Sequence, residues 1–126
     1  MKKRSILIVD DEPSVITALT RSLADEGYDI HAAANAEEAL RVLARTPIQV
    51  LITDEHMPGM SGTELLAVVR QRHPHIVRMM LTGRADVESA MHAVNQGEIY
   101  RFFTKPWDPY ELKLSLWNGF EKYDIE

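Results

Sequence analysis

The chain contains no cysteine among its 126 residues. Disulfide bonds, thiol chemistry and cysteine-ligated zinc are therefore excluded. The chain also has no apolar run long enough to cross a membrane. The basic residues 1–4 are followed by too short an apolar stretch for a secretory signal. We therefore expect a cytoplasmic protein that does not contact a membrane.

An excess of positive charge is also missing. The 14 Lys and Arg residues are outnumbered by 19 Asp and Glu residues, which gives a formal net charge of −5. A surface that binds nucleic acid directly is therefore not expected. No linker or low-complexity tract interrupts the chain, whose length suits one hydrophobic core. We expect a single domain over residues 1–126.

Five short apolar runs, each bounded by turn or cap residues, indicate buried β-strands. They alternate with segments in which apolar residues recur at helical spacing. This alternation predicts an α/β fold, a parallel sheet with helices on both faces. The second run is the least apolar and is expected at an edge of the sheet. The expected strands cover residues 6–9, 28–33, 49–54, 76–81 and 99–103.

Cap and stop residues set the expected helix boundaries. The acidic pair before Pro13 predicts the start of the first helix, which Gly27 would end. Ser61 and Glu64 have the spacing of a capping box, so a helix should begin there. Asp108 followed by proline predicts the start of the last helix.

Charged or hydroxyl side chains follow four of the apolar runs: Asp10 and Asp11, Asp54, Thr82, and Lys105. Parallel strands deliver their carboxyl ends to one edge of the sheet, where open α/β sheets bind ligands. Three clustered carboxylates repel one another unless a cation neutralises them, and Mg²⁺ suits oxygen ligands. The alternative interpretation is that these carboxylates form an exposed acidic rim without a bound ion, and that Lys105 is a solvated surface residue.

The residues around these positions resemble the receiver domain of bacterial two-component response regulators, including the chemotaxis-regulator type. The resemblance is carried by Ile-Leu-Ile-Val-Asp-Asp-Glu-Pro, Thr-Asp-Glu-His-Met-Pro-Gly-Met-Ser-Gly, Leu-Thr-Gly and Phe-Phe-Thr-Lys-Pro-Trp, and it covers nearly the whole chain. It implies a doubly wound (βα)5, flavodoxin-like three-layer sandwich whose five strands lie in the order 2-1-3-4-5.

The resemblance also implies roles for the residues at the expected strand ends. Asp54 would accept a phosphoryl group, since an aspartate carboxylate is a recognised nucleophile in phosphoryl transfer. Asp11, Asp54 and the main-chain carbonyl of His56 would bind Mg²⁺ directly, and Asp10 would act mainly through water. Lys105 would hold a phosphoryl oxygen. The protein would be a signalling switch rather than an enzyme, assisting only its own phosphorylation and dephosphorylation.

Two further residues would change position after phosphorylation in such a domain. Thr82 would turn toward the phosphoryl group, and Phe102 would move with it, although Phe102 simply buried in the core is the alternative. The bond between Lys105 and Pro106 would be cis. We also hypothesise that His56 affects autodephosphorylation from the mouth of the site.

The implied partners are a sensor histidine kinase or a phosphotransfer protein, and a downstream output domain or protein. The responding surface would comprise the fourth helix, the fifth strand and the fifth helix, and a homodimer through the two helices is an alternative use of that surface. The Leu-Thr-Gly and Phe-Phe-Thr-Lys-Pro-Trp segments are similar to those of receivers joined to enzymatic domains such as cyclic-dinucleotide phosphodiesterases. Two alternatives remain: a phosphatase or phosphotransferase of the haloacid dehalogenase type, and a degenerate receiver that serves only as a scaffold.

Overall fold

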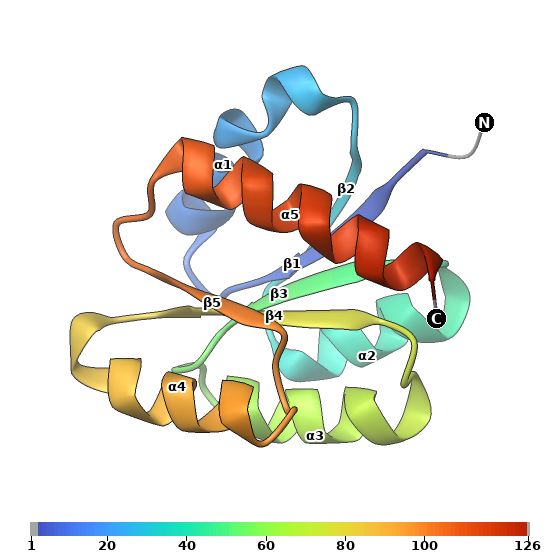
Figure 1. The fold of residues 1–126 in the computed structure, drawn as a ribbon. Coiled ribbons are helices and arrows are strands. Elements are labelled where there is room, and N and C mark those ends of the chain that lie inside the picture. The colour runs from blue at the N-terminus through green and yellow to red at the C-terminus, as the bar shows by residue number, and fades with distance from the viewer. Residues whose placement is uncertain (1–2, 126) are drawn as a thin grey trace.

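The computed structural model describes residues 3–125; residues 1, 2 and 126 of the predicted domain lie outside the described residues. Five parallel strands form one sheet in the order β2-β1-β3-β4-β5, which confirms the predicted fold and places β2 at an edge (Figure 1). The strands are β1 (Ser5–Val9), β2 (Asp29–Ala33), β3 (Val50–Asp54), β4 (Val77–Thr82) and β5 (Arg101–Thr104).

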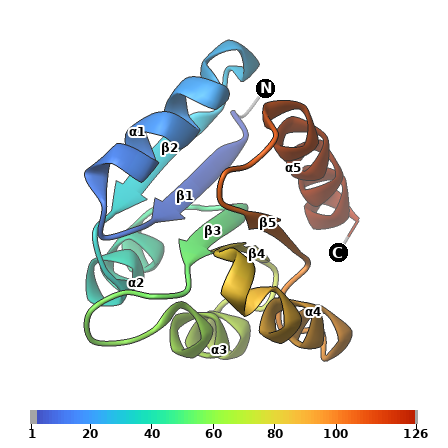
Figure 2. The same ribbon diagram turned by 90° about the vertical axis from the view of Figure 1, so that its left-hand side faces the viewer.

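Helices cover both faces of the sheet. In Figure 2, α1 and α5 lie on one side, whereas α2, α3 and α4 lie on the other. The described helices are α1 (Pro13–Ser22), α2 (Ala36–Arg45), α3 (Gly62–Arg72), α4 (Val87–Asn95) and α5 (Pro109–Asp124). This arrangement gives three layers, with a hydrophobic core on each side of the sheet.

The alternating directions of side chains along a strand divide the apolar residues between the two cores. On β1, Leu7 and Val9 pack with residues of α2 and α3, while Ile6 and Ile8 pack with residues of α1 and α5. All four are essentially inaccessible to solvent. A strand buried on both faces needs such a continuous apolar run, which is why this segment of the sequence was recognisable.

The helix boundaries confirm some expectations and correct others. Ser61 caps α3, and Glu64 returns the bond to the Ser61 N–H, so the capping box is present. Asp108 caps α5 by accepting from the N–H of Tyr110. The predicted start of α1 is confirmed, because the helix begins at Pro13 with Glu12 at the N-cap position, although the Glu12 side chain makes no capping hydrogen bond.

The first helix, however, ends earlier than predicted. The α1 helix stops at Ser22, and a separate 3₁₀ turn, Ala24–Glu26, leads to Gly27. Gly27, with a φ of 73°, directly follows this 3₁₀ turn and ends it. It therefore does not end the α-helix itself. At the fifth strand, pairing with β4 starts only at Arg101, two residues after the expected start. Propensity locates elements well but their ends poorly, because local contacts decide the last turn.

Candidate phosphorylation site

The carboxyl ends of β1, β3, β4 and β5 bring the predicted site residues together. Val9 pairs with Thr53, so Asp10 and Asp54 each stand at or just beyond the end of neighbouring strands. Thr82 pairs with Thr104, and the N–H of Lys105 donates to the Thr82 carbonyl at 2.9 Å. The parallel register, rather than proximity in the sequence, therefore assembles the site.

Asp10 is a buried carboxylate, only 1% exposed. Its Oδ1 accepts from the N–H of Glu12 at 2.9 Å, whereas Oδ2 has no hydrogen-bond partner among the described residues. Burial raises the pKa of Asp10, the bond from Glu12 opposes that shift, and the charge of Asp54 adds to it. Removing a carboxylate from water disfavours its ionised form, so Asp10 would gain from a nearby cation.

Asp54 ends β3, is 6% exposed and forms an ion pair with Lys105. The Lys105 ammonium lies 3.0 Å from Asp54 Oδ1 and 3.7 Å from Asp10 Oδ2. Burial lowers the pKa of Lys105, but hydrogen bonding and charge attraction to Asp54, with the charge of Asp10, raise it overall. Lys105 is therefore a fixed positive charge beside the Asp54 carboxylate. The peptide bond that follows, Lys105–Pro106, is cis as expected.

Thr82 and Phe102 lie close to the site but are oriented differently. The buried Thr82 hydroxyl donates to the Gly83 carbonyl at 3.3 Å, so it is directed along its own loop. Phe102 is half-buried and packs against the core on the α4 side of the sheet. Both residues share cavity walls with residues of α4.

The structure adds a contact that sequence reasoning missed. His56 Nε2 lies 2.8 Å from Asp86 Oδ2, which joins the loop after β3 to the turn before α4. The hydrogen bond and charge of Asp86 raise the pKa of His56. Asp86 occupies the N-cap position of α4, yet its side chain does not cap that helix. No local pattern could reveal this pair, because 30 residues separate its members.

Gly62 is a second residue that was not singled out. It begins α3 directly beneath Asp54, and its N–H donates to the Glu55 carbonyl at 2.9 Å. A Cβ on Gly62 would lie 3.0 Å from both the Asp54 carbonyl carbon and the Glu55 Cα. The sequence did contain one indication: Gly62 directly follows the cap residue Ser61, at the first position of the helix. A capping box does not itself require glycine at that position.

A family model described as the response regulator receiver domain matches residues 6–116, most of the chain. This chain belongs to that family. Phosphorylation of an aspartate is the general role of receiver domains in two-component systems. The predicted recognition, fold class and general function are thereby confirmed, and the haloacid dehalogenase interpretation is set aside.

Named relatives of this receiver domain include transcriptional regulators. The chain is 40% identical to the hydrogenase transcriptional regulatory protein HoxA of Cupriavidus necator over 88% of its length, covering 23% of that protein. It is 36% identical to the response regulator protein PilR of Pseudomonas aeruginosa over 90% of its length, covering 25% of that protein. The chain thus spans about a quarter of the length of these relatives.

A solved structure has nearly the same fold. The signal receiver domain of an HD domain-containing protein from Pseudomonas fluorescens Pf-5 superposes with a TM-score of 0.92 at 37% identity, covering 99% of this chain and 100% of that one. The three relatives carry different names, and only the name of the solved structure mentions a receiver domain.

Receiver domains generally depend on Mg²⁺, and the acidic residues of this chain fit that ion. Carboxylate oxygens of Asp10, Asp11 and Glu12 lie within 4.8 Å of one another. The buried Asp10 Oδ2, which lacks a hydrogen-bond partner among the described residues, is a donor that a hard cation would satisfy. Glu12 was absent from the predicted ligand set, and it joins the cluster because it occupies the N-cap position of α1, two residues after Asp10.

Proposed function

We propose that Asp54 accepts a phosphoryl group from a phosphohistidine on a sensor histidine kinase or phosphotransfer protein. The observation that carries this proposal is the ion pair of 3.0 Å between Asp54 and Lys105 at the carboxyl edge of the sheet. A buried carboxylate held beside a fixed cation is placed to attack phosphorus while the charge on the phosphoryl oxygens is neutralised.

In the transfer, an Asp54 oxygen forms a bond to phosphorus while the phosphorus–nitrogen bond of the phosphohistidine breaks. The imidazole nitrogen leaves with the bonding electron pair and takes a proton from solvent. Lys105 would then hold a phosphoryl oxygen as a point charge. Asp10, Asp11, Asp54 and the main-chain carbonyl of His56 would hold Mg²⁺, which would supply further charge neutralisation.

Phosphorylation adds roughly −1.5 to −2 charges and strong acceptor oxygens beside Thr82. We infer that the Thr82 hydroxyl leaves the Gly83 carbonyl for a phosphoryl oxygen, and that Phe102 repacks against α4. The weak geometry of the present Thr82 bond, 3.3 Å, supports this exchange. The change would spread over the surface formed by α4, β5 and α5.

That surface is apolar enough to receive a partner. Large hydrophobic side chains are exposed on α4 and α5, including Tyr110 and Trp117 at 74% and 59% exposure. We propose that it contacts a downstream output domain or a second copy of the chain. Sites of protein association are commonly rich in exposed aromatic residues.

We further propose that the chain is one domain over residues 1–126 and acts as a signalling switch rather than an enzyme. Its partners would be proteins and not nucleic acid, in keeping with the net charge of −5. Within the described residues, no helix is long and apolar enough to span a membrane. We propose a cytoplasmic location, where sensor kinases present their phosphohistidine.

Intact-mass measurement after incubation with acetyl phosphate and Mg²⁺ tests the proposal. The wild-type chain should gain one phosphoryl group, and both Asp54→Asn and omission of Mg²⁺ should prevent the gain. Asp25→Asn removes an exposed carboxylate in the turn after α1 and should leave the gain unchanged. A folded wild-type protein that is never modified, or an Asp54→Asn variant that still is, would contradict the assignment.

A further inference from the structure

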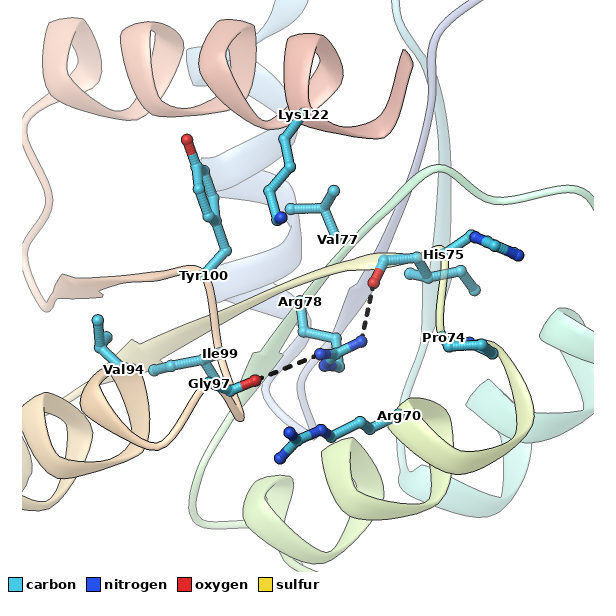
Figure 3. A pocket seen from close by; sticks show the side chains of 11 residues that line it. Arg70, Pro74, His75, Val77, Arg78, Val94, Gly97, Ile99, Tyr100 and Lys122 are labelled. Atoms are coloured by element: carbon cyan, nitrogen blue, oxygen red, sulfur yellow. Dashed lines mark hydrogen bonds between the residues drawn. The ribbon is translucent and has the colours of Figure 1, made fainter. Parts of the chain in front are cut away.

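A second cavity lies at the opposite edge of the sheet from Asp54. It has a volume of about 390 Å³ and opens between α3, the start of β4, the segment before β5 and the end of α5 (Figure 3). Cavities of this size accommodate small molecules. Because it lies where strands begin rather than where they end, it is separate from the proposed phosphorylation site.

The cavity is basic in a chain that is acidic overall. Arg70 of α3, Arg78 of β4 and Lys122 of α5 contribute to its wall; His75 also lines it, but its imidazole points away from these three side chains (Figure 3). No Asp or Glu lines it among residues 3–125. Three cationic side chains from three separate elements therefore meet at one hollow, although the formal charge of the whole chain is −5.

The structure orients two of these cations, Arg78 and Lys122. Arg78 donates to the carbonyls of Glu98 at 2.9 Å and Ile76 at 3.1 Å, which orients its guanidinium. The Lys122 ammonium lies 5.8 Å from the centre of the Tyr100 ring, an arrangement favourable to a cation. In Figure 3, Lys122 and Arg70 extend toward the region of Arg78 from opposite sides.

We propose that this cavity binds the phosphate groups of a small phosphorylated molecule. Guanidinium groups match phosphate oxygens through paired N–H donors, and lysine adds a point charge. Apolar residues, among them Val77, Val94 and Ile99, line other parts of the wall and would contact the carbon skeleton of the ligand. The proposal does not depend on phosphorylation of Asp54.

Amide chemical shifts recorded by NMR during titration provide the test. The titrations use the wild-type chain without Mg²⁺ at low salt, so that Lys105 stays paired with Asp54 and the acidic edge of the sheet offers no unpaired cation to an anion. Sodium pyrophosphate and AMP are the probes, with adenosine and citrate as comparisons. Saturable shifts are expected for pyrophosphate and AMP at amides lining the cavity, such as those of Val77 and Gly97.

Variants then test which cations hold the ligand. Arg70→Gln and Lys122→Met should each weaken pyrophosphate binding by about tenfold, the factor expected for one charge-assisted hydrogen bond. Both leave the Arg78 bonds to the main chain intact. Lys113→Met is the matched control, because it removes the same charge from α5 at a position outside the cavity, where Lys113 faces Glu26.

Equal weakening by Lys122→Met and Lys113→Met would overturn the proposal, since it would indicate nonspecific attraction to a positive surface. Adenosine that binds as tightly as AMP would show that phosphate is not recognised. Citrate that binds more tightly than either phosphate compound would reassign the cavity to carboxylates. Absence of saturable shifts with all four probes would exclude a small-anion site.

Discussion

Replacing Gly62 with alanine tests how α3 positions the phosphoacceptor. The added Cβ would lie 3.0 Å from the Asp54 carbonyl carbon and 3.0 Å from the Glu55 Cα, and closer still to the Asp54 carbonyl oxygen. These are main-chain atoms of β3 and its following loop, so they cannot rotate away as the end of a side chain would. Either α3 or the end of β3 must shift.

The cost follows from overpacking and helix propensity. Inserting a methyl group into a packed site typically costs about 1–3 kcal/mol, whereas alanine in place of glycine regains at most about 1 kcal/mol in a helix. We therefore expect Gly62→Ala to lower the free energy of unfolding by about 1–2 kcal/mol. For a domain of this size, that corresponds to a fall in Tm of roughly 3–10 °C.

Gly83→Ala is the matched control at the same edge of the sheet. Its φ is −77°, and the nearest atom to an added Cβ is Asp86 Oδ2 at 3.9 Å. Its stability should therefore stay within about 0.5 kcal/mol of wild type. Thermal unfolding and denaturant titration of both variants give the comparison. Equal stability of the two variants would refute the argument that α3 is seated against the Asp54 main chain.

The same substitution has a kinetic consequence if Asp54 is the acceptor. Displacing a reacting group by about 1 Å can reduce a rate by roughly a hundredfold. Gly62→Ala should therefore slow phosphorylation by acetyl phosphate roughly ten- to hundredfold under conditions where it remains folded. Gly83→Ala should have a much smaller effect on that rate.

Three further results are expected. Ser61→Ala should lower the free energy of unfolding by about 0.5–2 kcal/mol in urea titrations, because it removes the cap of α3; an unchanged midpoint would contradict the role of the capping box. Asp10→Asn should raise Tm in EDTA, since it removes an ionised group that burial disfavours, and should reduce the Tm increase caused by Mg²⁺. His56→Ala and Asp86→Asn should each shorten the phosphoryl lifetime and show no additive effect when combined, because both break one contact; wild-type decay in either variant would exclude the contact from that role.

The sequence was sufficient for the sheet and for most of the site. Asp10 and Asp54 follow apolar runs, and parallel pairing requires the ends of such runs to meet at one edge. Lys105 and Thr82 could be placed by the same rule. The sequence could therefore predict that Lys105 lies near Asp54. It could not predict the 3.0 Å contact itself, because that geometry depends on the register of strands that are distant in the sequence.

Contacts between loops were not predictable in this way. The pair of His56 and Asp86 depends on how two loops of different strands lean toward each other, and neither residue carries a pattern for it. Glu12 was read as part of a helix start, yet it contributes a carboxylate to the acidic cluster. Caps and loops follow local geometry that periodicity does not encode.

The two ends of β4 lie in surroundings of opposite charge, so the net charge of the chain does not describe the charge at either end. The strand begins near Arg78 in the basic cavity and ends at Thr82 beside the acidic site. A formal charge of −5 describes only the sum of these two ends. Because exposed charges are screened beyond roughly 10 Å at moderate salt, each end attracts ligands according to its own neighbours. The net charge therefore argues against a broad nucleic-acid surface but does not exclude a local anion site at the edge of the sheet where Arg70, Arg78 and Lys122 meet.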